Sequence, residues 1–188
     1  MRQIYFVIIA LLFFALNIQA QQKSELKFSS INQFGILKGS SDQALQIQTV
    51  NGAAYKTWFA GAGAGLDDYN FKTFTIFADL RKNILNKSQT PFVYVDMGTS
   101  IPSKKQEEDL WQTTTYKSGL YFDAGVGYTI PIKGSLSFNF SAGYSQKYLH
   151  ETRMAKGIVI DYPAGGGPQA EYYDYTFKRL SIKMALRF

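Results

Sequence analysis

The chain has 188 residues, with 20 Lys and Arg against 14 Asp and Glu and a formal net charge of +6, which is enough sequence for one domain. It contains no cysteine, and this excludes both a disulfide framework and a thiolate metal site. The basic residues form no run interleaved with aromatic residues, so nucleic acid is not an expected partner.

The first twenty residues have the layout of a secretory signal peptide. Arg2 precedes an apolar run from Ile4 to Leu16, and Ala20 supplies the small residue of a cleavage site. A transmembrane anchor is the alternative, but the run is shorter than the ~20 residues that a spanning helix needs. We therefore expect export, with residues 1–20 as the signal peptide and 21–188 as the mature domain.

The rest of the chain reads as a series of strands. Segments rich in Tyr, Phe, Val, Thr and Gly recur between turn sequences, and none reaches the ~18 consecutive apolar residues of a spanning helix. The predicted strands are 25–37, 44–53, 57–67, 72–83, 91–101, 116–129, 135–148 and 172–188.

The connections between these strands alternate in length. Short turns are expected at 54–57, 84–89 and 131–134, whereas the longest loops, 102–114 and 149–171, fall at the opposite end of an up-and-down meander. Short turns at one end and long loops at the other are typical of a transmembrane β-barrel. The strands of a soluble barrel with an apolar interior also alternate apolar and polar residues. The residues on the two faces of each strand therefore have to distinguish a soluble barrel from a transmembrane one.

One face of each predicted strand is polar and mostly small. It carries glycine or serine at most positions, with a few opposite charges, which suits the narrow lumen of an eight-stranded barrel better than a surface in water. We expect a buried network that holds the fourth to sixth strands in register; an ion path is the alternative. The residues of the expected lumen charge network are Asp79, Arg81, Asp96 and Asp123.

The other face is apolar. Stripes such as Phe74, Ile76, Ala78 and Leu80 cover the height of a membrane's apolar band. Aromatic residues fall near the ends of the stripes, where the girdles of a membrane barrel belong. These aromatic residues are Trp58, Tyr128, Tyr144 and Phe188.

The last strand alternates up to the final residue, which is aromatic. Leu180, Ile182, Met184, Leu186 and Phe188 share one parity. In this the chain resembles the outer-membrane β-barrel proteins of Gram-negative bacteria, and most closely the small OmpA-type barrels. The resemblance implies an all-β, eight-stranded antiparallel up-and-down transmembrane barrel. It also implies export through the periplasm, insertion by the outer-membrane assembly machinery, which reads this terminal signal, and contact with outer-membrane lipid.

Lys178 departs from the alternation of the last strand, because it is a charged residue at a position whose parity faces lipid. Either a bulge shifts the register there or the strand has left the hydrocarbon, and we favour projection beyond the membrane. Residues 157–162 and 170–177 would then form a β-hairpin around the turn 163–168, above the outer leaflet. A possible surface-binding set on this hairpin is Tyr162, Tyr172, Tyr173 and Tyr175.

Nothing in the sequence requires enzyme chemistry. His150, the single histidine, can be grouped with Ser145 and Asp161 on paper, but the spacing does not demand it, and no catalytic residue, cofactor or metal is expected. The acidic residues 107–109 point in different directions and are a weak metal signal. We predict an integral outer-membrane protein with a structural or surface-binding role; the alternatives are a narrow channel for small solutes and a soluble exported barrel that binds an apolar ligand.

Overall fold

The computed structural model describes residues 26–40, 42–68, 72–155 and 170–188 of the chain. The predicted signal peptide, 1–20, lies outside these residues, as do Tyr162, Asp161 and the expected hairpin arm 157–162. Within the described part, no helix is long and apolar enough to cross a membrane.

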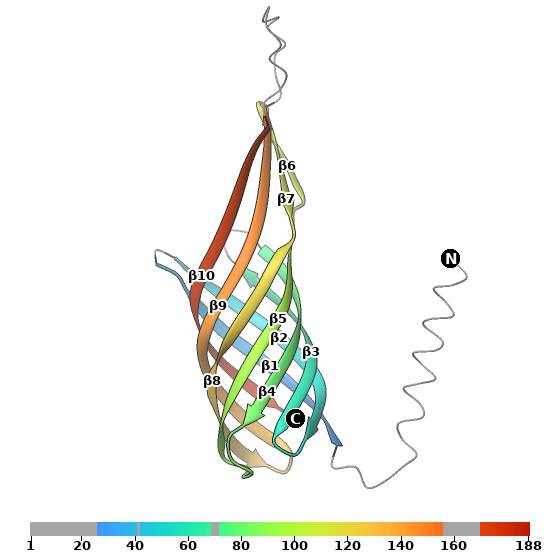
Figure 1. Ribbon diagram of the computed structural model, residues 1–188, viewed down its shortest axis with the longest axis vertical. Helices are drawn as coiled ribbons and strands as arrows, with labels where there is room; N and C mark the ends of the chain where they lie inside the picture. Colours follow the sequence, from blue (N-terminus) through green and yellow to red (C-terminus); the bar gives the residue numbers. More distant parts are fainter. Residues whose placement is uncertain (1–25, 41, 69–71, 156–169) are drawn as a thin grey trace, which may run out of the picture.

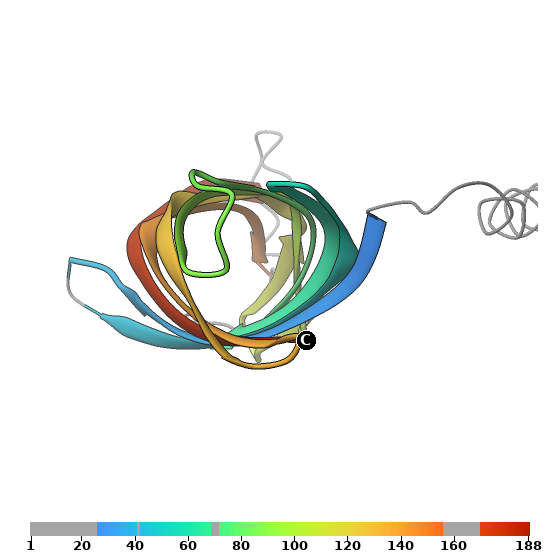
Figure 2. The same cartoon turned by 90° about the horizontal axis from the view of Figure 1, so that it is seen from below.

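The described residues form ten antiparallel strands, and eight of them close a ring (Figures 1 and 2). The ring runs β1, β2, β3, β4, β5, β8, β9, β10 and returns to β1. The short strands β6 and β7 are added beyond the ring, beside the upper part of β9. The strands are β1 (Leu26–Lys38), β2 (Gln43–Tyr55), β3 (Trp58–Asp68), β4 (Lys72–Asn83), β5 (Thr90–Pro102), β6 (Gln106–Glu108), β7 (Gln112–Lys117), β8 (Gly119–Lys133), β9 (Leu136–Ala155) and β10 (Ala170–Arg187).

The closed ring confirms the predicted eight-stranded antiparallel up-and-down barrel. The three expected short turns lie at one end, where Lys56 and Gly134 adopt the left-handed backbone conformation that tight turns use. At the same end the connection 84–89 reaches across part of the barrel mouth (Figure 2).

The seam between the first and last strands is closed up to the final residue. The N–H of Phe188 donates to the carbonyl of Ser30 at 2.8 Å, and the N–H of Ser30 donates back to the Phe188 carbonyl at 3.2 Å. Lipid offers no hydrogen-bond partner to a free strand edge, so this pairing satisfies the backbone where the ring meets itself.

The side chains alternate as a membrane barrel requires. Outward positions on β10 carry Leu180, Ile182 and Met184, which are 61%, 50% and 49% exposed, whereas Ser181 and Lys183 between them are buried in the lumen. An apolar exterior around a polar interior is the arrangement of a transmembrane barrel. The alternative from the sequence, a soluble barrel, needs the reverse arrangement, with an apolar interior.

The upper part of the molecule corrects the sequence analysis. Strand β9 continues to Ala155, well past the expected end at 148, and the expected loop 102–114 contains β6 and the start of β7, which pair as a hairpin. Together β6, β7, the upper part of β9 (149–155) and the upper part of β10 (170–178) form a four-stranded sheet above the ring, which we call the extension sheet (Figure 1).

The predicted sixth strand is divided between β7 and β8 by a bulge. Lys117 is paired with His150 but Tyr121 with Lys147, so one extra residue is accommodated near Ser118. A bulge of this kind reverses the parity of the strand, and Tyr116 and Tyr121 consequently both face inward. At Gly119 the backbones approach so closely that a Cβ would lie 1.9 Å from the Tyr148 carbonyl oxygen.

Candidate functional site: the lumen network and the extension sheet

Large aromatic side chains fill much of the lumen. Phe77 lies opposite Gly63 on the neighbouring strand, and Phe92 lies opposite Gly127. A Cβ at either glycine would lie 2.3 Å from the facing ring, so the glycines provide the space that the rings occupy. The small residues on this face were predicted from the sequence, but the rings that they accommodate were not.

Arg81 is held at one place in this interior by several partners. Its Nη2 lies 2.6 Å from Asp79 Oδ2, and the same nitrogen donates to the Gln33 side-chain oxygen at 3.2 Å. The guanidinium also lies over the rings of Phe92 and Tyr94, 5.7 and 5.9 Å from their centroids. Arg81 therefore connects β4 with β1 as well as neutralising the adjacent carboxylate.

The other two predicted carboxylates share a different cation. Lys183 Nζ lies 3.2 Å from Asp96 Oδ2 and 3.0 Å from Asp123 Oδ2, and all three side chains are buried. The Tyr94 hydroxyl donates to Asp123 Oδ1 at 2.8 Å. The network thus crosses the lumen from β5 and β8 to β10, rather than remaining within the fourth to sixth strands.

The sequence contained a signal for the missing cation. The expected set has three carboxylates and one guanidinium, and a buried site tolerates such an imbalance poorly. Lys183 lies on the lumen parity of the last strand and reduces the excess of negative charge in this set from two to one. It was missed because its partners are distant in the chain.

A further ion pair lies nearer the extension sheet. Lys147 of β9 contacts Asp67 of β3, and its Nζ lies 3.3 Å from the Thr73 hydroxyl and 3.2 Å from the Thr75 hydroxyl, both on β4. Neither Lys147 nor Asp67 was singled out from the sequence. The two networks together hold opposite walls of the barrel at fixed positions.

The extension sheet continues the inner face of the barrel upward. Tyr173, Tyr175 and Phe177 stack along β10, with centroid separations of 6.3 and 6.1 Å. Arg153 on β9 lies over the Tyr173 ring at 4.8 Å and pairs with the buried Glu151. Burial and the neighbouring Glu107 carboxylate raise the pKa of Tyr116, on β7, to about 12.

The structure places the predicted surface tyrosines on two faces of this sheet. Tyr172 is 76% exposed on the outer face, whereas Tyr173 and Tyr175 belong to the inner aromatic stack and are 37% exposed and half-buried, respectively. Lys178 lies beyond the last pair between β10 and β1, Leu180 with Lys38, while pairing with β9 continues without a shift. Projection of the strand, not a bulge, therefore explains its parity.

Two residues considered for catalysis, Ser145 and His150, are not brought together, and the third, Asp161, lies outside the described residues. Ser145 is buried in the lumen, whereas His150 lies on the opposite face of β9 and its Nδ1 is 2.5 Å from Asp174 Oδ1. In the described residues, no group of three or more His, Cys, Asp or Glu side chains is arranged to hold a metal ion, and this includes residues 107–109.

Comparison with known proteins gives structural neighbours only. No family model and no curated protein matches the sequence. Neisserial surface protein A is similar with a TM-score of 0.49 and 9% identity, over 89% of this chain and 100% of that one. The outer membrane protein OprG from Pseudomonas aeruginosa gives 0.47 and 9%, over 89% and 98%. A major outer membrane protein from Thermus thermophilus gives 0.45 and 15%, over 86% and 100%.

The fold itself rests on the geometry of the molecule. Eight strands close on themselves, their outward side chains form an apolar band, and their inward side chains form a charged and aromatic interior. The chain is therefore a closed transmembrane-type barrel that carries an additional sheet at one end.

Proposed function

We propose that the chain is an integral outer-membrane protein that binds a partner at the cell surface through its extension sheet. The observation that carries the proposal is the open edge of β10. Residues 170–178 pair with β9 on one side, but the described part of the chain supplies no strand on the other, because pairing with β1 begins at Leu180.

An open strand edge is a template for an added strand. Its unpaired N–H and C=O groups bind an extended segment of a partner, and the alternating side chains determine which segment fits. On β10 these side chains are the exposed Tyr172 on one face and the Tyr173–Tyr175–Phe177 stack on the other. The other end of the sheet, β6, has three residues only, two of them glutamates, and offers a much poorer edge.

The interior favours this role over that of a channel. Phe77, Phe92, Tyr94 and Tyr121 are all at most 3% exposed, and the ion pairs of Lys183 with Asp96 and of Lys147 with Asp67 join strands across the lumen. A packed lumen of this kind is normal for eight strands and supports a binding role rather than conduction.

The orientation of the barrel can be tested directly, because the chain has no native cysteine. A Leu110→Cys variant, at the tip of the β6–β7 hairpin where the side chain is 84% exposed, is expected to react with a membrane-impermeant maleimide on intact cells. A Lys133→Cys variant, at the opposite end, is expected to react only after the outer membrane is permeabilised. The reverse labelling pattern would place the extension sheet in the periplasm and reject a cell-surface role.

The binding edge can be tested by crosslinking on living cells. A photoreactive amino acid at position 172 is expected to give a crosslinked product on the cell surface, and the additional change Tyr173→Ala with Tyr175→Ala is expected to remove it, because the aromatic stack beneath the edge is lost. The matched control carries the same probe at Ile132, which is 56% exposed at the other end. Equal amounts of crosslinked product from the two positions would mean that the β10 edge does not bind a partner selectively.

A further inference from the structure

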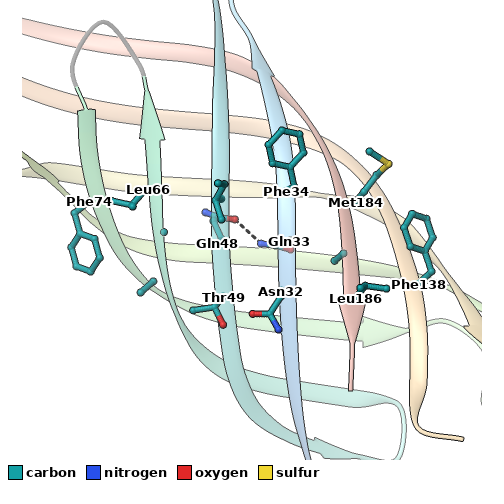
Figure 3. A pocket seen from close by; sticks show the side chains of 14 residues that line it. Asn32, Gln33, Phe34, Gln48, Thr49, Leu66, Phe74, Phe138, Met184 and Leu186 are labelled. Carbon is teal, nitrogen blue, oxygen red and sulfur yellow. Dashed lines mark hydrogen bonds between the residues drawn. The ribbon is translucent and has the colours of Figure 1, made fainter.

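A polar patch interrupts the membrane-facing wall. The outward positions of β1 and β2 include Ser30, Asn32, Thr49 and Asn51, where the other strands carry mostly apolar residues or alanine, with Thr99 of β5 an exception. The register sets Asn32 directly beside Thr49 and Ser30 beside Asn51, so the four side chains form one cluster. Figure 3 shows Asn32 and Thr49 pointing outward from neighbouring strands.

The register also gives the depth of this patch. Outward residues that are paired from strand to strand form one line, which runs around the barrel from one edge of its wall to the other. Asn32 and Thr49 lie at the centre of this line. Three apolar residues lie on one side of the pair, and Ala64, Ile76, Thr99 and Leu120 lie on the other. The full line is Ile130, Phe138, Leu186, Asn32, Thr49, Ala64, Ile76, Thr99 and Leu120.

An amide at this depth needs a hydrogen-bond partner. Hydrocarbon supplies none, and an amide left without a partner there is costly. Among the residues drawn in Figure 3, a hydrogen bond joins Gln33 and Gln48 on the inner side of the wall, whereas none joins Asn32 or Thr49 to a neighbour.

Two residues of the patch, Asn32 and Thr49, line a groove that a second wall can enter. The groove has a volume of about 710 Å³, and Asn32, Thr49 and Ala64 are among the residues that line it. Larger side chains, including Phe34, Leu66 and Leu186, line its margins. Small residues at a membrane interface allow two backbones to approach closely, which is what a short amide needs in order to reach its partner.

We propose that this groove is a homodimer interface within the membrane, with Asn32 paired across a two-fold axis. A primary amide is both donor and acceptor, so two copies of Asn32 can satisfy each other, and the same patch then serves both subunits. A lipid acyl chain fills the groove but leaves the amide unpaired. A second copy of the chain meets both requirements, and the interface is independent of the extension sheet.

Disulfide trapping in the native membrane tests this interface. A Thr49→Cys variant, which retains Asn32, is expected to form a covalent dimer when an oxidant is added. The same variant with Asn32→Leu is expected to lose most of that dimer, and Val95→Cys, on the wall half-way round the ring, is expected to give only background. Background levels in Thr49→Cys, or no effect of Asn32→Leu, would overturn the proposal.

A mass measurement in detergent provides the second readout. The wild-type protein is expected to sediment with the protein mass of two chains and Asn32→Leu with that of one. Because leucine suits a lipid-facing position, Asn32→Leu is expected to remain folded, as shown by its resistance to heat denaturation on gels. A wild-type protein with the mass of one chain, with or without bound lipid, would overturn the proposal.

Discussion

Replacing Lys183 with methionine is expected to lower the free energy of unfolding of the barrel by about 3–5 kcal/mol. The Lys183 side chain is 2% exposed and its ammonium group lies between Asp96 and Asp123, neither of which has any exposed side-chain surface. Without Lys183 the two carboxylates remain in the lumen without their shared cation. The measurement is urea unfolding of the purified barrel in lipid vesicles, followed by tryptophan fluorescence.

A control is available on the same strand. Lys178 lies on β10 beyond the last pair with β1, and its side chain is exposed. Lys178→Met is expected to change the free energy of unfolding by no more than about 1 kcal/mol, because a lysine near the interface costs little. A similar loss in both variants would show that the effect comes from removing any lysine of this strand.

A variant that lacks all three charges distinguishes the loss of an ion pair from the cost of an unpaired charge in the lumen. The triple change Lys183→Met, Asp96→Asn and Asp123→Asn is expected to recover most of the stability, because no unpaired ion is left in the lumen. If the triple variant were as unstable as Lys183→Met, then packing of the lysine stem rather than its charge would be responsible. That result would contradict the ion-pair account.

The sequence was most informative where lipid constrains it. Inside the membrane each strand must place apolar residues outward and polar residues inward, so the period of two is visible in stretches such as 74–80 and 180–188. The extension sheet is under no such constraint. Leu149, Glu151 and Arg153 share the inner face of β9, and a set that mixes apolar with charged residues gives no alternation to detect.

Lumen contacts were predicted only in part, for a geometric reason. A strand pattern indicates which side chains point inward, but not which of them meet across the ring. Arg81 and Asp79 are two residues apart and could be paired from the sequence, whereas Lys183 and Asp96 are 87 residues apart and meet only after the ring closes. The bulge near Ser118 likewise depends on β9 and left no mark in the local pattern.

The terminal residue is expected to have two separable roles, and its deletion is expected to be the most damaging change for the protein in cells. Deleting Phe188 removes both backbone hydrogen bonds to Ser30 and the bond from the Ser29 hydroxyl at 2.9 Å. At roughly 0.5–1.5 kcal/mol for each hydrogen bond, the closed seam is weakened even in a purified barrel. We expect slower refolding into lipid vesicles and almost no folded protein in the outer membrane.

The variant Phe188→Ala distinguishes the role of this residue in closing the seam from its role in recognition by the assembly machinery. Alanine keeps the backbone groups that pair with Ser30 and removes only a ring that is 51% exposed on the outside of the barrel. The purified variant should therefore refold nearly as well as the wild type, whereas its folded amount in cells should fall sharply if the assembly machinery reads the terminal aromatic residue. Leu186→Ala, two residues earlier on the same face, serves as the matched lipid-facing control. A normal cellular level of Phe188→Ala would leave seam closure as the sole role of this residue.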